Sequence, residues 1–237
     1  MNKPTTALQF SGGKDSLACL YLLRPVWQHI YVVWVNSGAA YPETVEQMAQ
    51  IRALVPHFIE VNADQPSQIA REGFPSDLVP ISFTRFGQDT RPQNDTRIQP
   101  WVTCCRDNLW IPLHKTMLDL GITTIIRGQK TTDYRTAPLK SGSVIDGIEY
   151  LFPIEDWTDQ DVMDYLIAEG VTVPAYYEWS DTSLDCTTCT AYLDERRHEL
   201  WNMQFVHPEI WKEVEPRLRA IAAAVETEYE ALRELCP

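Results

Sequence analysis

The first 65 residues alternate between short apolar runs, typical of strands buried on both faces, and segments of helical periodicity. The apolar runs are residues 7–10, 30–35 and 58–61. Residues 16–23 place apolar side chains at helical spacing. Pro42 and Glu43 favour the first turn of a second helix, which we expect to end at Leu54. Strands that alternate with helices in this way predict a parallel sheet.

The pattern dissolves from Pro75 to Trp101, where prolines, glycine and polar residues dominate. A stretch of this length inside a compact domain predicts a functional or mobile loop. It carries arginines that we expect to close over a ligand: Arg85, Arg91 and Arg97, with Arg106 soon after.

Regular elements return after this loop. Helical spacing at residues 108–120 and a β-rich run at residues 122–126 predict a helix and a fourth strand. Thr158 is expected to cap a helix over residues 158–169, with Asp161 completing a capping box and Gly170 ending the helix.

The last stretch, residues 193–235, has a strongly helical composition, and its charge run Asp194-Glu195-Arg196-Arg197 predicts an exposed helical face. We therefore expect a Rossmann-like, doubly wound parallel α/β sheet in residues 1–190. A helical C-terminal extension is expected in residues 191–237.

Composition and charge narrow the function. The chain has 237 residues, 44% of them hydrophobic, which suits one medium domain with an extension. A net charge of −13 argues against a polynucleotide partner, because nucleic-acid affinity depends on basic groups. There is no apolar run of about 18 residues and no signal-peptide layout, so we expect a cytoplasmic protein outside the membrane.

A glycine-rich turn follows the first predicted strand: Ser11-Gly12-Gly13-Lys14-Asp15-Ser16. The glycines let backbone N–H groups approach a phosphate, the helix N-terminus adds partial positive charge, and Lys14 adds a full one. The spacing of the glycines and lysine excludes a Walker loop. The turn therefore predicts a phosphate site, and the alternative is an ordinary strand-to-helix turn rich in small residues.

Four of the six cysteines form two pairs, Cys104 with Cys105 and Cys186 with Cys189. Cysteines of a cytosolic protein are more often thiols, ligands or catalysts than structural disulfides. Four thiolates suit zinc or an iron–sulfur cluster, although adjacent cysteines are awkward ligands for one tetrahedral ion. Unligated thiols or a redox disulfide remain as alternatives. Cys19 lies inside the first predicted helix and is expected in the core.

Four cations flank the predicted carboxyl ends of the strands: Lys14, Arg127, Lys130 and Arg135. Ligands of open α/β sheets bind at this edge, and guanidinium forks match phosphate and sulfate oxygens. For each of the four, solvated surface charge is the alternative interpretation.

Taken in order, these segments resemble a known family. The glycine-rich turn resembles the PP-loop of the adenine nucleotide α-hydrolase group. Five further segments resemble motifs of one branch of that group, the phosphoadenosine phosphosulfate (PAPS) and adenylyl sulfate (APS) reductases: Asn36-Ser37-Gly38 with Pro42-Glu43-Thr44, Cys104-Cys105 with Pro112-Leu113, Gly128-Gln129-Lys130 with Arg135, Pro153-Ile154 (strand) with Asp156-Trp157-Thr158 and Asp161-Val162 (helix), and Cys186-Thr187-Thr188-Cys189-Thr190. The resemblance covers residues 7 to about 190.

The resemblance implies an oxidoreductase of sulfur metabolism that reduces PAPS or APS to sulfite and a nucleoside phosphate. It implies a 4Fe-4S cluster on the four paired cysteines, and catalytic roles for Lys14, Lys130 and Arg135. The nucleotide-binding residues that it implies are Ser11, Gly12, Gly13, Lys14, Asp15, Ser16, Asn36, Gly38 and Gly128. Cys236 would be the nucleophile, and a thioredoxin-type thiol would resolve the resulting thiosulfonate.

Three features depart from the family pattern. The tail reads Arg233-Glu234-Leu235-Cys236-Pro237 and lacks the Glu-Cys-Gly-x-His setting of the family's nucleophile. Leu109 stands where these reductases carry a lysine near the cluster. The intact phosphate loop is the form that ATP-cleaving members of the group keep.

The departures leave two alternatives open. One is an ATP-pyrophosphatase-type sulfur transferase, which binds magnesium through Asp15 and adenylates a tRNA, DNA or small-molecule acceptor. The other is an inactive nucleotide-binding regulatory protein. The sequence leaves the oligomeric state open, a homo-oligomer included.

Overall fold

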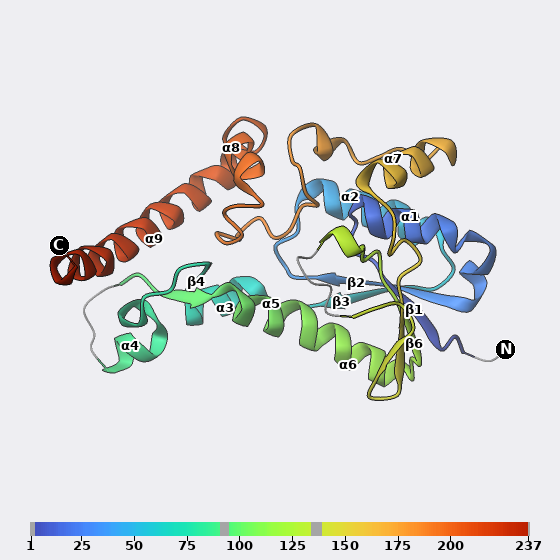
Figure 1. Ribbon diagram of the computed structural model, residues 1–237, viewed down its shortest axis with the longest axis horizontal. Helices are drawn as coiled ribbons and strands as arrows, with labels where there is room; N and C mark the ends of the chain where they lie inside the picture. Colours follow the sequence, from blue (N-terminus) through green and yellow to red (C-terminus); the bar gives the residue numbers. More distant parts are fainter. Residues whose placement is uncertain (1–2, 91–94, 134–138, 237) are drawn as a thin grey trace. The chain divides into compact units, whose positions relative to one another are not determined.

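The computed structural model describes residues 3–90, 95–133 and 139–236. The chain forms two compact units that are interleaved along the sequence (Figure 1). Unit 1 comprises Met1–Asn36, Tyr41–Asn62 and Pro112–Glu178. Unit 2 comprises Ser37–Ala40, Ala63–Ile111 and Trp179–Pro237.

Unit 1 is built on a six-stranded sheet with the strand order β3-β2-β1-β6-β8-β7. Its strands are β1 (Thr6–Gln9), β2 (Ile30–Asn36), β3 (Phe58–Asn62), β6 (Thr124–Ile126), β7 (Ser143–Ile145) and β8 (Ile148–Leu151). All described neighbours pair in parallel except β7, which runs antiparallel to β8. Ala7 on the central β1 pairs with both Tyr31 and Ile125. The doubly wound α/β sheet that the sequence predicts is confirmed.

Helices cover both faces of this sheet, which is why β1 and β2 read as continuous apolar runs. Three of them, α1 (Lys14–Leu22), α2 (Pro42–Leu54) and α7 (Asp159–Ala168), lie on one face, and α6 (Ile111–Leu120) lies on the other (Figure 1). Beneath α6, Met117 packs with Ala7, Val33 and Ile125 in an apolar cluster. Short helical turns occupy Arg24–His29, Thr131–Asp133 and Ala175–Glu178.

Two local predictions in unit 1 are confirmed. Thr158 caps α7: its hydroxyl accepts from the Asp161 amide at 3.2 Å, and the Asp161 carboxylate accepts from the Thr158 amide at 2.7 Å. Cys19 is fully buried inside α1 and belongs to the core.

The β7–β8 hairpin is a difference from the sequence prediction, which places the strand after residue 126 at Pro153-Ile154. The strand β8 ends at Leu151, before these residues. Asp146 and Gly147 join the hairpin, and both have positive φ (51° and 79°), as a two-residue type I′ turn requires. An Asp-Gly pair between short apolar segments is a hairpin signal, so the sequence contained the information.

Unit 2 contains a two-stranded parallel sheet, β4 (Phe74–Ser76) with β5 (Ile98–Pro100), surrounded by helices. Its helices are α3 (Gln65–Glu72), α4 (Arg85–Thr90), α5 (Trp101–Cys105), α8 (Arg197–Val206) and α9 (Pro208–Leu235). A π-helical turn, Arg106–Trp110, follows α5.

The expectation of a structureless loop from Pro75 to Trp101 is wrong for most of its described residues. This stretch contains most of β4, a 3-10 turn at Ile81–Phe83, α4 and β5; residues 91–94 lie outside the described part of the chain. Phe83 and Ile98 are buried against Ile221 and Ala224 of α9. These partners come more than 120 residues later, so local periodicity carried no sign of the segment's burial.

The predicted exposed charge run is also corrected. Residues 194–196 precede α8, which begins at Arg197, and a break at His207 separates α8 from α9. Arg196 is only 1% exposed. It is buried because Glu199, equally buried, pairs with it.

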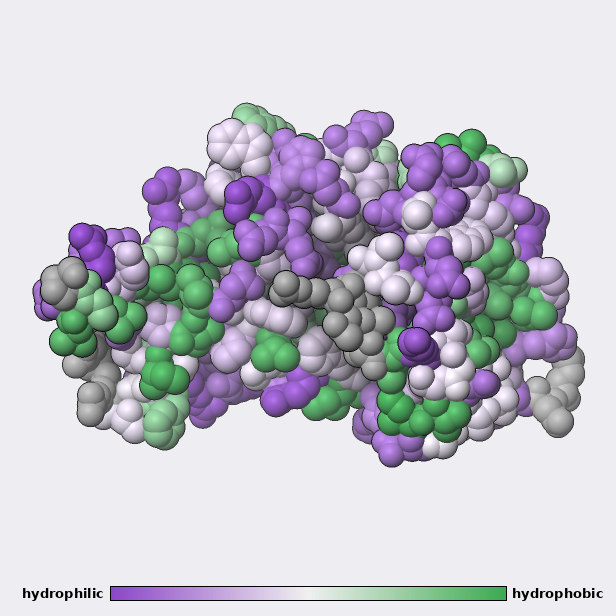
Figure 2. Space-filling model, viewed as in Figure 1, coloured by the Kyte–Doolittle hydropathy of each residue, from purple (hydrophilic) through white to green (hydrophobic). Residues whose placement is uncertain are grey.

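Apolar side chains of unit 2 also reach the surface. Ile81 and Phe86 near α4 and Leu232 and Leu235 near the end of α9 are largely exposed. Figure 2 shows apolar side chains, in green, at the end of the view where these elements lie. Among the described helices, none combines the length and apolar character that crossing a membrane requires.

Candidate functional site

The glycine-rich turn after β1 is closed by its own hydroxyl groups. Gly12 has φ of 92°, a conformation that favours glycine. The Ser16 hydroxyl accepts from the Gly12 amide at 3.2 Å and donates to the Gly13 carbonyl at 2.9 Å. Ser11 donates to the Ser16 hydroxyl at 3.2 Å. The turn therefore leads into the N-terminus of α1 with a fixed backbone.

Two adjacent tyrosines from the turn Ala175–Glu178 hold this loop. The buried Tyr176 hydroxyl donates to the Gly12 carbonyl at 3.1 Å. The Lys14 amide donates to the Tyr177 hydroxyl at 2.9 Å, and the Lys14 ammonium lies 6.0 Å from the centre of the Tyr177 ring. Sequence reasoning missed both tyrosines, because they lie more than 160 residues away from the loop and carry no motif.

Lys14 and Lys130 meet next to this loop. The Lys130 ammonium lies 2.8 Å from an Asp15 oxygen and 2.9 Å from an Asp133 oxygen. The Lys14 ammonium lies 2.8 Å from Asp159 and 3.1 Å from Asp15. Asp159 also approaches Lys130, at 3.3 Å. We call these five residues the lysine–aspartate cluster; Asp133 and Asp159 were not foreseen as site residues.

The charges of the lysine–aspartate cluster stabilise one another. Burial lowers the pKa of Lys130, but hydrogen bonds to Asp15 and Asp133 outweigh it, so the pKa rises above its ordinary value. Burial also opposes the charge of Lys14, and Asp159 and Asp15 together raise the pKa of that lysine. The hydrogen bond from Lys14 holds the pKa of Asp159 below its usual range. Both lysines are therefore fully charged at neutral pH.

The cluster lies where the sheet topology changes direction, between β1 and β6. Such switch points are where open α/β sheets bind ligands. Gly128 makes the meeting possible: a Cβ there would lie 2.6 Å from the Asp15 carbonyl carbon and 2.7 Å from the Ser16 nitrogen. Only glycine lets the loop after β6 press against the first turn of α1.

Other predicted site residues lie elsewhere. Arg127 donates to the Gln9 side chain at 2.5 Å and stacks over the Tyr150 ring, so it is not part of the lysine–aspartate cluster. The side-chain amide of Asn36 donates a hydrogen bond to the Glu60 carboxylate at 2.8 Å. Gly38 belongs to unit 2 and has φ of 82°. Arg135 lies outside the described residues.

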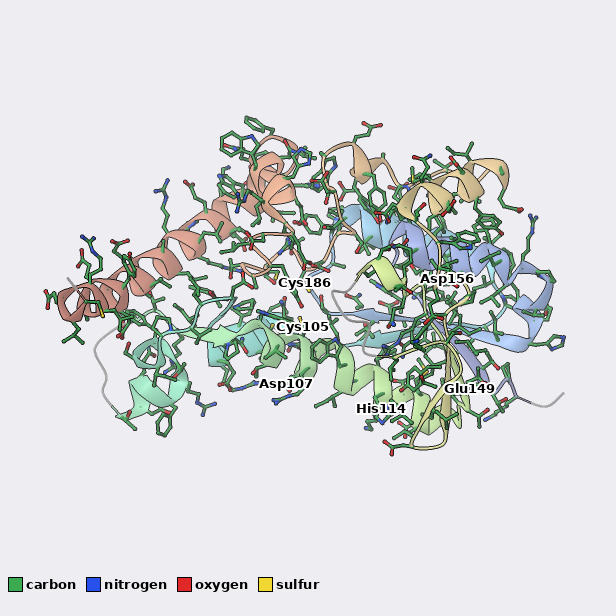
Figure 3. The ribbon with its side chains drawn as sticks, viewed as in Figure 1. Cys105, Asp107, His114, Glu149, Asp156 and Cys186 are labelled. Atoms are coloured by element: carbon green, nitrogen blue, oxygen red, sulfur yellow. The ribbon has the colours of Figure 1, made fainter. Side chains whose placement is uncertain are left out.

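The four paired cysteines all belong to unit 2. Cys104 and Cys105 end α5, while Cys186 and Cys189 lie in a turn whose backbone pairs with Ala40. Gln65 links the pairs: its amide donates to the Cys104 sulfur at 3.5 Å, and its carbonyl accepts from Thr188, between the other two cysteines. Figure 3 labels one thiol of each pair, Cys105 and Cys186.

Each thiol has its own polar neighbourhood. Cys186 lies 3.1 Å from the Ser37 hydroxyl, and Cys105 lies 3.7 Å from the Tyr192 hydroxyl. Burial raises the pKa of Cys105 to about 12 and that of Cys189 to about 11. Cys189 is near enough for its charge to act on Cys105. Among the described residues, no three histidine, cysteine or acidic side chains converge as ligands of one metal ion.

Arg196 is a further residue at these thiols. Its guanidinium donates to the Cys189 carbonyl at 3.2 Å and holds both oxygens of Glu199, at 2.9 and 2.5 Å. Nearby, Tyr192 has a positive φ of 59°, and its amide donates to Asp77. Its ring lies 4.5 Å from that of Trp101.

Cys236 follows a different element from the four paired cysteines. It is exposed and follows the last residue of α9, a helix of 28 residues. At 1.5 Å per residue the helix is about 42 Å long, so its two ends are widely separated.

The comparisons with known proteins all point to the same family. The sequence model of the phosphoadenosine phosphosulfate reductase domain matches residues 5–192. The adenosine 5'-phosphosulfate reductase of Mycobacterium tuberculosis is 33% identical over 91 residues, which are 37% of this chain and 35% of that protein. The same enzyme of Mycolicibacterium smegmatis is 33% identical over 90 residues, 37% of this chain and 38% of that protein. The matched segment thus spans little more than a third of these relatives.

A solved structure shares the fold. The phosphoadenylyl-sulfate (PAPS) reductase from Candida auris, solved as a phosphate complex, superposes with a TM-score of 0.54 at 13% identity. The superposition covers 77% of this chain and 81% of that one. At this identity the likeness concerns the fold alone.

Proposed function

The chain belongs to the phosphoadenosine phosphosulfate reductase domain family, and from this premise we propose that it binds an adenine nucleotide at residues 11–16. The observation that carries the proposal is the meeting of Lys14 and Lys130 beside the glycine-rich loop, at the switch point of the sheet. Two ammonium groups and a helix N-terminus together suit a phosphate or sulfate group. Gly128, which permits that meeting, belongs to the same proposed site.

The reaction that the family favours is reduction of a sulfonucleotide, PAPS or APS. The Cys236 thiolate attacks the sulfate sulfur, the bond from sulfur to the phosphate oxygen breaks, and a nucleoside phosphate leaves. A thioredoxin-type dithiol then attacks the thiosulfonate, which releases sulfite and leaves a disulfide on that donor. Lys14, Lys130 and Arg135 hold the anionic groups. This mechanism requires the end of α9 to reach the nucleotide.

A 4Fe-4S cluster on Cys104, Cys105, Cys186 and Cys189 is the cofactor that we propose. Four sulfur donors from two segments of one unit, joined through Gln65, provide the donor chemistry that such a cluster needs. The four cysteine thiolates would be the ligands that hold such a cluster. When bound, such a cluster supplies a one-electron redox centre to the protein.

A second candidate function follows from the carboxylates around the lysines. Two ammonium groups and three carboxylates leave the lysine–aspartate cluster with one net negative charge. A polyphosphate binds there favourably when Mg²⁺ accompanies it, with Asp15 as the metal ligand. This favours an ATP-cleaving enzyme that releases pyrophosphate, adenylates an acceptor and transfers sulfur to it.

One set of assays on anaerobically purified protein separates these functions. Sulfite release from PAPS or APS with thioredoxin, abolished in Cys236→Ser, supports the reductase. Pyrophosphate release from ATP and Mg²⁺, lost in Lys14→Met and dependent on an added acceptor, supports the second candidate. Nucleotide binding without either activity leaves a regulatory protein, and absence of nucleotide binding contradicts the proposal as a whole. Iron and sulfide analysis of the same sample tests the cluster.

A further inference from the structure

Helix α9 changes character along its length. In its first half the apolar side chains are covered, and Val214 and Ile221 are buried. The same stripe continues to the end of the helix. Leu232 follows Val225, which packs on the core of unit 2, by one heptad, and Leu235 follows Ile221 by two. Leu232 and Leu235 are nevertheless 62% and 79% exposed, so the apolar face of α9 runs on beyond the core that covers its first part.

Exposed apolar side chains of a second segment lie beside this end of α9. The Ser82 hydroxyl donates to the Glu228 carboxylate, which joins the turn Ile81–Phe83 to the last third of the helix. Ile81 in this turn and Phe86 on α4 are largely exposed. Figure 2 shows green, apolar side chains at the end of the view where these elements lie. We define the α9-end surface as the exposed apolar side chains of both segments: Ile81, Phe86, Tyr229, Leu232 and Leu235.

The glutamates of α9 divide into two rows along the helix. The first row forms ion pairs at 2.6–3.5 Å with a lysine or arginine three or four residues later: Glu209, Glu213 and Glu215. The second row recurs at every fourth residue and forms no ion pair within the described part of the chain: Glu226, Glu230 and Glu234. Arg233 lies against the Tyr229 ring instead, 6.0 Å from its centre. Like charges four residues apart destabilise a helix, so the second row calls for cations from elsewhere.

The charge of the second row discriminates between the molecules that would cover the α9-end surface. A second copy joined through the same surface would bring one row of glutamates against another, and anionic lipid headgroups or nucleic acid would be repelled in the same way. A protein segment with apolar side chains beside lysines or arginines complements both the leucines and the glutamates. An amphipathic helix presents such groups at spacings of three and four residues, which match the spacings on α9.

We propose that the α9-end surface is a docking site for a basic amphipathic helix of a partner protein. Apolar side chains of the partner pack on Leu232, Leu235 and Ile81, and its lysines or arginines pair with the second row of glutamates. The inference goes beyond the nucleotide site, and it holds for either of the candidate activities.

The test uses the full chain and a fluorescein-labelled synthetic peptide of about three heptads, with leucine at positions a and d and lysine beside them. Fluorescence anisotropy measures the affinity of the peptide for the wild type and three variants. The leucine variant is Leu232→Ser with Leu235→Ser. The second-row variant changes the three glutamates of that row to glutamine, and the matched control makes the same change in the first row. The two row variants therefore remove the same charge from the same helix.

We expect the leucine variant and the second-row variant each to weaken peptide binding about tenfold, because one loses the apolar contact and the other the ion pairs. The first-row control stays within about twofold of the wild type, since those glutamates already have cations. Added salt weakens binding to the wild type more than to the second-row variant. A peptide with glutamate in place of lysine does not bind. If the leucine variant loses helix content by circular dichroism, the two row variants still carry the test.

Four results would overturn the inference. Absence of peptide binding by the wild type removes the docking site. Equal weakening in the two row variants shows a general attraction between a basic peptide and an acidic protein. Self-association in analytical ultracentrifugation that the leucine variant abolishes shows that a second copy covers the surface. Binding to phosphatidylglycerol vesicles without binding to the peptide shows that the surface contacts lipid.

Discussion

Within the part of the chain that the structure describes, each unit contains one fully buried cation, and the two differ in what surrounds them. Lys130 in unit 1 is 1% exposed, yet its partners open to solvent: the Asp159 side chain is 72% exposed. Arg196 in unit 2 is equally buried, and its main partner Glu199 is not exposed at all. Lys130 faces carboxylates that can turn away, whereas Arg196 is held by the buried carboxylate of Glu199, with the half-exposed Asp185 3.9 Å from its Nε atom.

The difference indicates which ionic groups are available to a ligand. Carboxylates at the surface can be replaced by phosphate or sulfate oxygens at small cost, because water solvates them when they leave. A buried carboxylate cannot leave without a large desolvation penalty. The lysine–aspartate cluster is therefore an exchangeable set, and the Arg196–Glu199 pair is a fixed one.

The largest expected effect comes from breaking the fixed pair. Arg196→Met leaves Glu199 buried without its partner and should lower the free energy of unfolding by about 3–5 kcal/mol. Urea unfolding followed by circular dichroism measures the change. The Arg196→Met, Glu199→Met double variant should recover most of the loss. If Lys130→Met, whose partners reach solvent, proves equally costly, the distinction between the two cations is wrong.

A smaller loss of stability is expected where the loop after β6, which contains Gly128, touches the first turn of α1. Gly128→Ala places a methyl group 2.6 Å from backbone and should cost about 1–3 kcal/mol, because the neighbour cannot move as a side chain end would. The control is Gly121→Ala, which meets nothing within 4 Å but has φ of 69°, so it costs about 1–2 kcal/mol for the left-handed conformation. Only the Gly128 variant should also lose nucleotide affinity, as measured by calorimetry. Equal nucleotide affinity in both variants would show that the contact does not shape the site.

In the lysine–aspartate cluster, removing a lysine and removing an aspartate should change the affinity for AMP in opposite directions when divalent cations are absent. Lys14→Met should weaken binding at least tenfold, about 1.4 kcal/mol, because the phosphate loses a full charge. Asp159→Asn should strengthen binding severalfold, since a carboxylate no longer competes for Lys14. Isothermal titration calorimetry measures both, with the exposed Lys115→Met on α6 as the control. Weaker binding in Asp159→Asn would mean that this carboxylate is itself a ligand group.

The smallest effect concerns acid stability of unit 1. The pKa of Asp159 is lowered in the folded protein, so its contribution is present above the unfolded value of about 3.9 and is lost as pH falls through the folded pKa. The free energy of unfolding of the wild type should therefore exceed that of Asp159→Asn at neutral pH, and this difference should disappear below about pH 4. Urea midpoints from pH 2 to 7 test this. The control is Asp164→Asn on the same helix, where the carboxylate accepts a hydrogen bond from the Gln160 side-chain amide at 2.7 Å.

Local signals in the sequence were enough for much of unit 1. The apolar runs of β1 and β2, the capping box at Thr158 and the glycine-rich turn each lie within a few residues, and the parallel sheet follows from their alternation. Lys14 and Lys130 were identified as cations, and the structure brings them together. Their partners Asp133 and Asp159 were missed, because nothing local distinguishes them from solvated acidic residues.

Unit 2 was less predictable, since long-range partners decide its burial. Arg196 lies in a run of four charged residues, which is typical of an exposed face, and only its pairing with Glu199 and Cys189 buries it. Phe83 and Ile98 lie in a segment rich in proline and polar residues, and their core is completed by α9. The four cysteines were recognisable as a set, but Gln65, which links the two pairs, carries no motif.

The hydroxyl of Tyr177 on the Lys14 amide has a consequence for how tightly any anion can be held. That amide already has a hydrogen-bond acceptor in the folded loop, so an incoming oxygen gains only the difference between two hydrogen bonds at this position. The loop therefore keeps its shape without relying on a guest molecule, and recognition becomes a substitution of one oxygen for another. The affinity of this loop for an anion then depends mainly on the charges of Lys14 and Lys130.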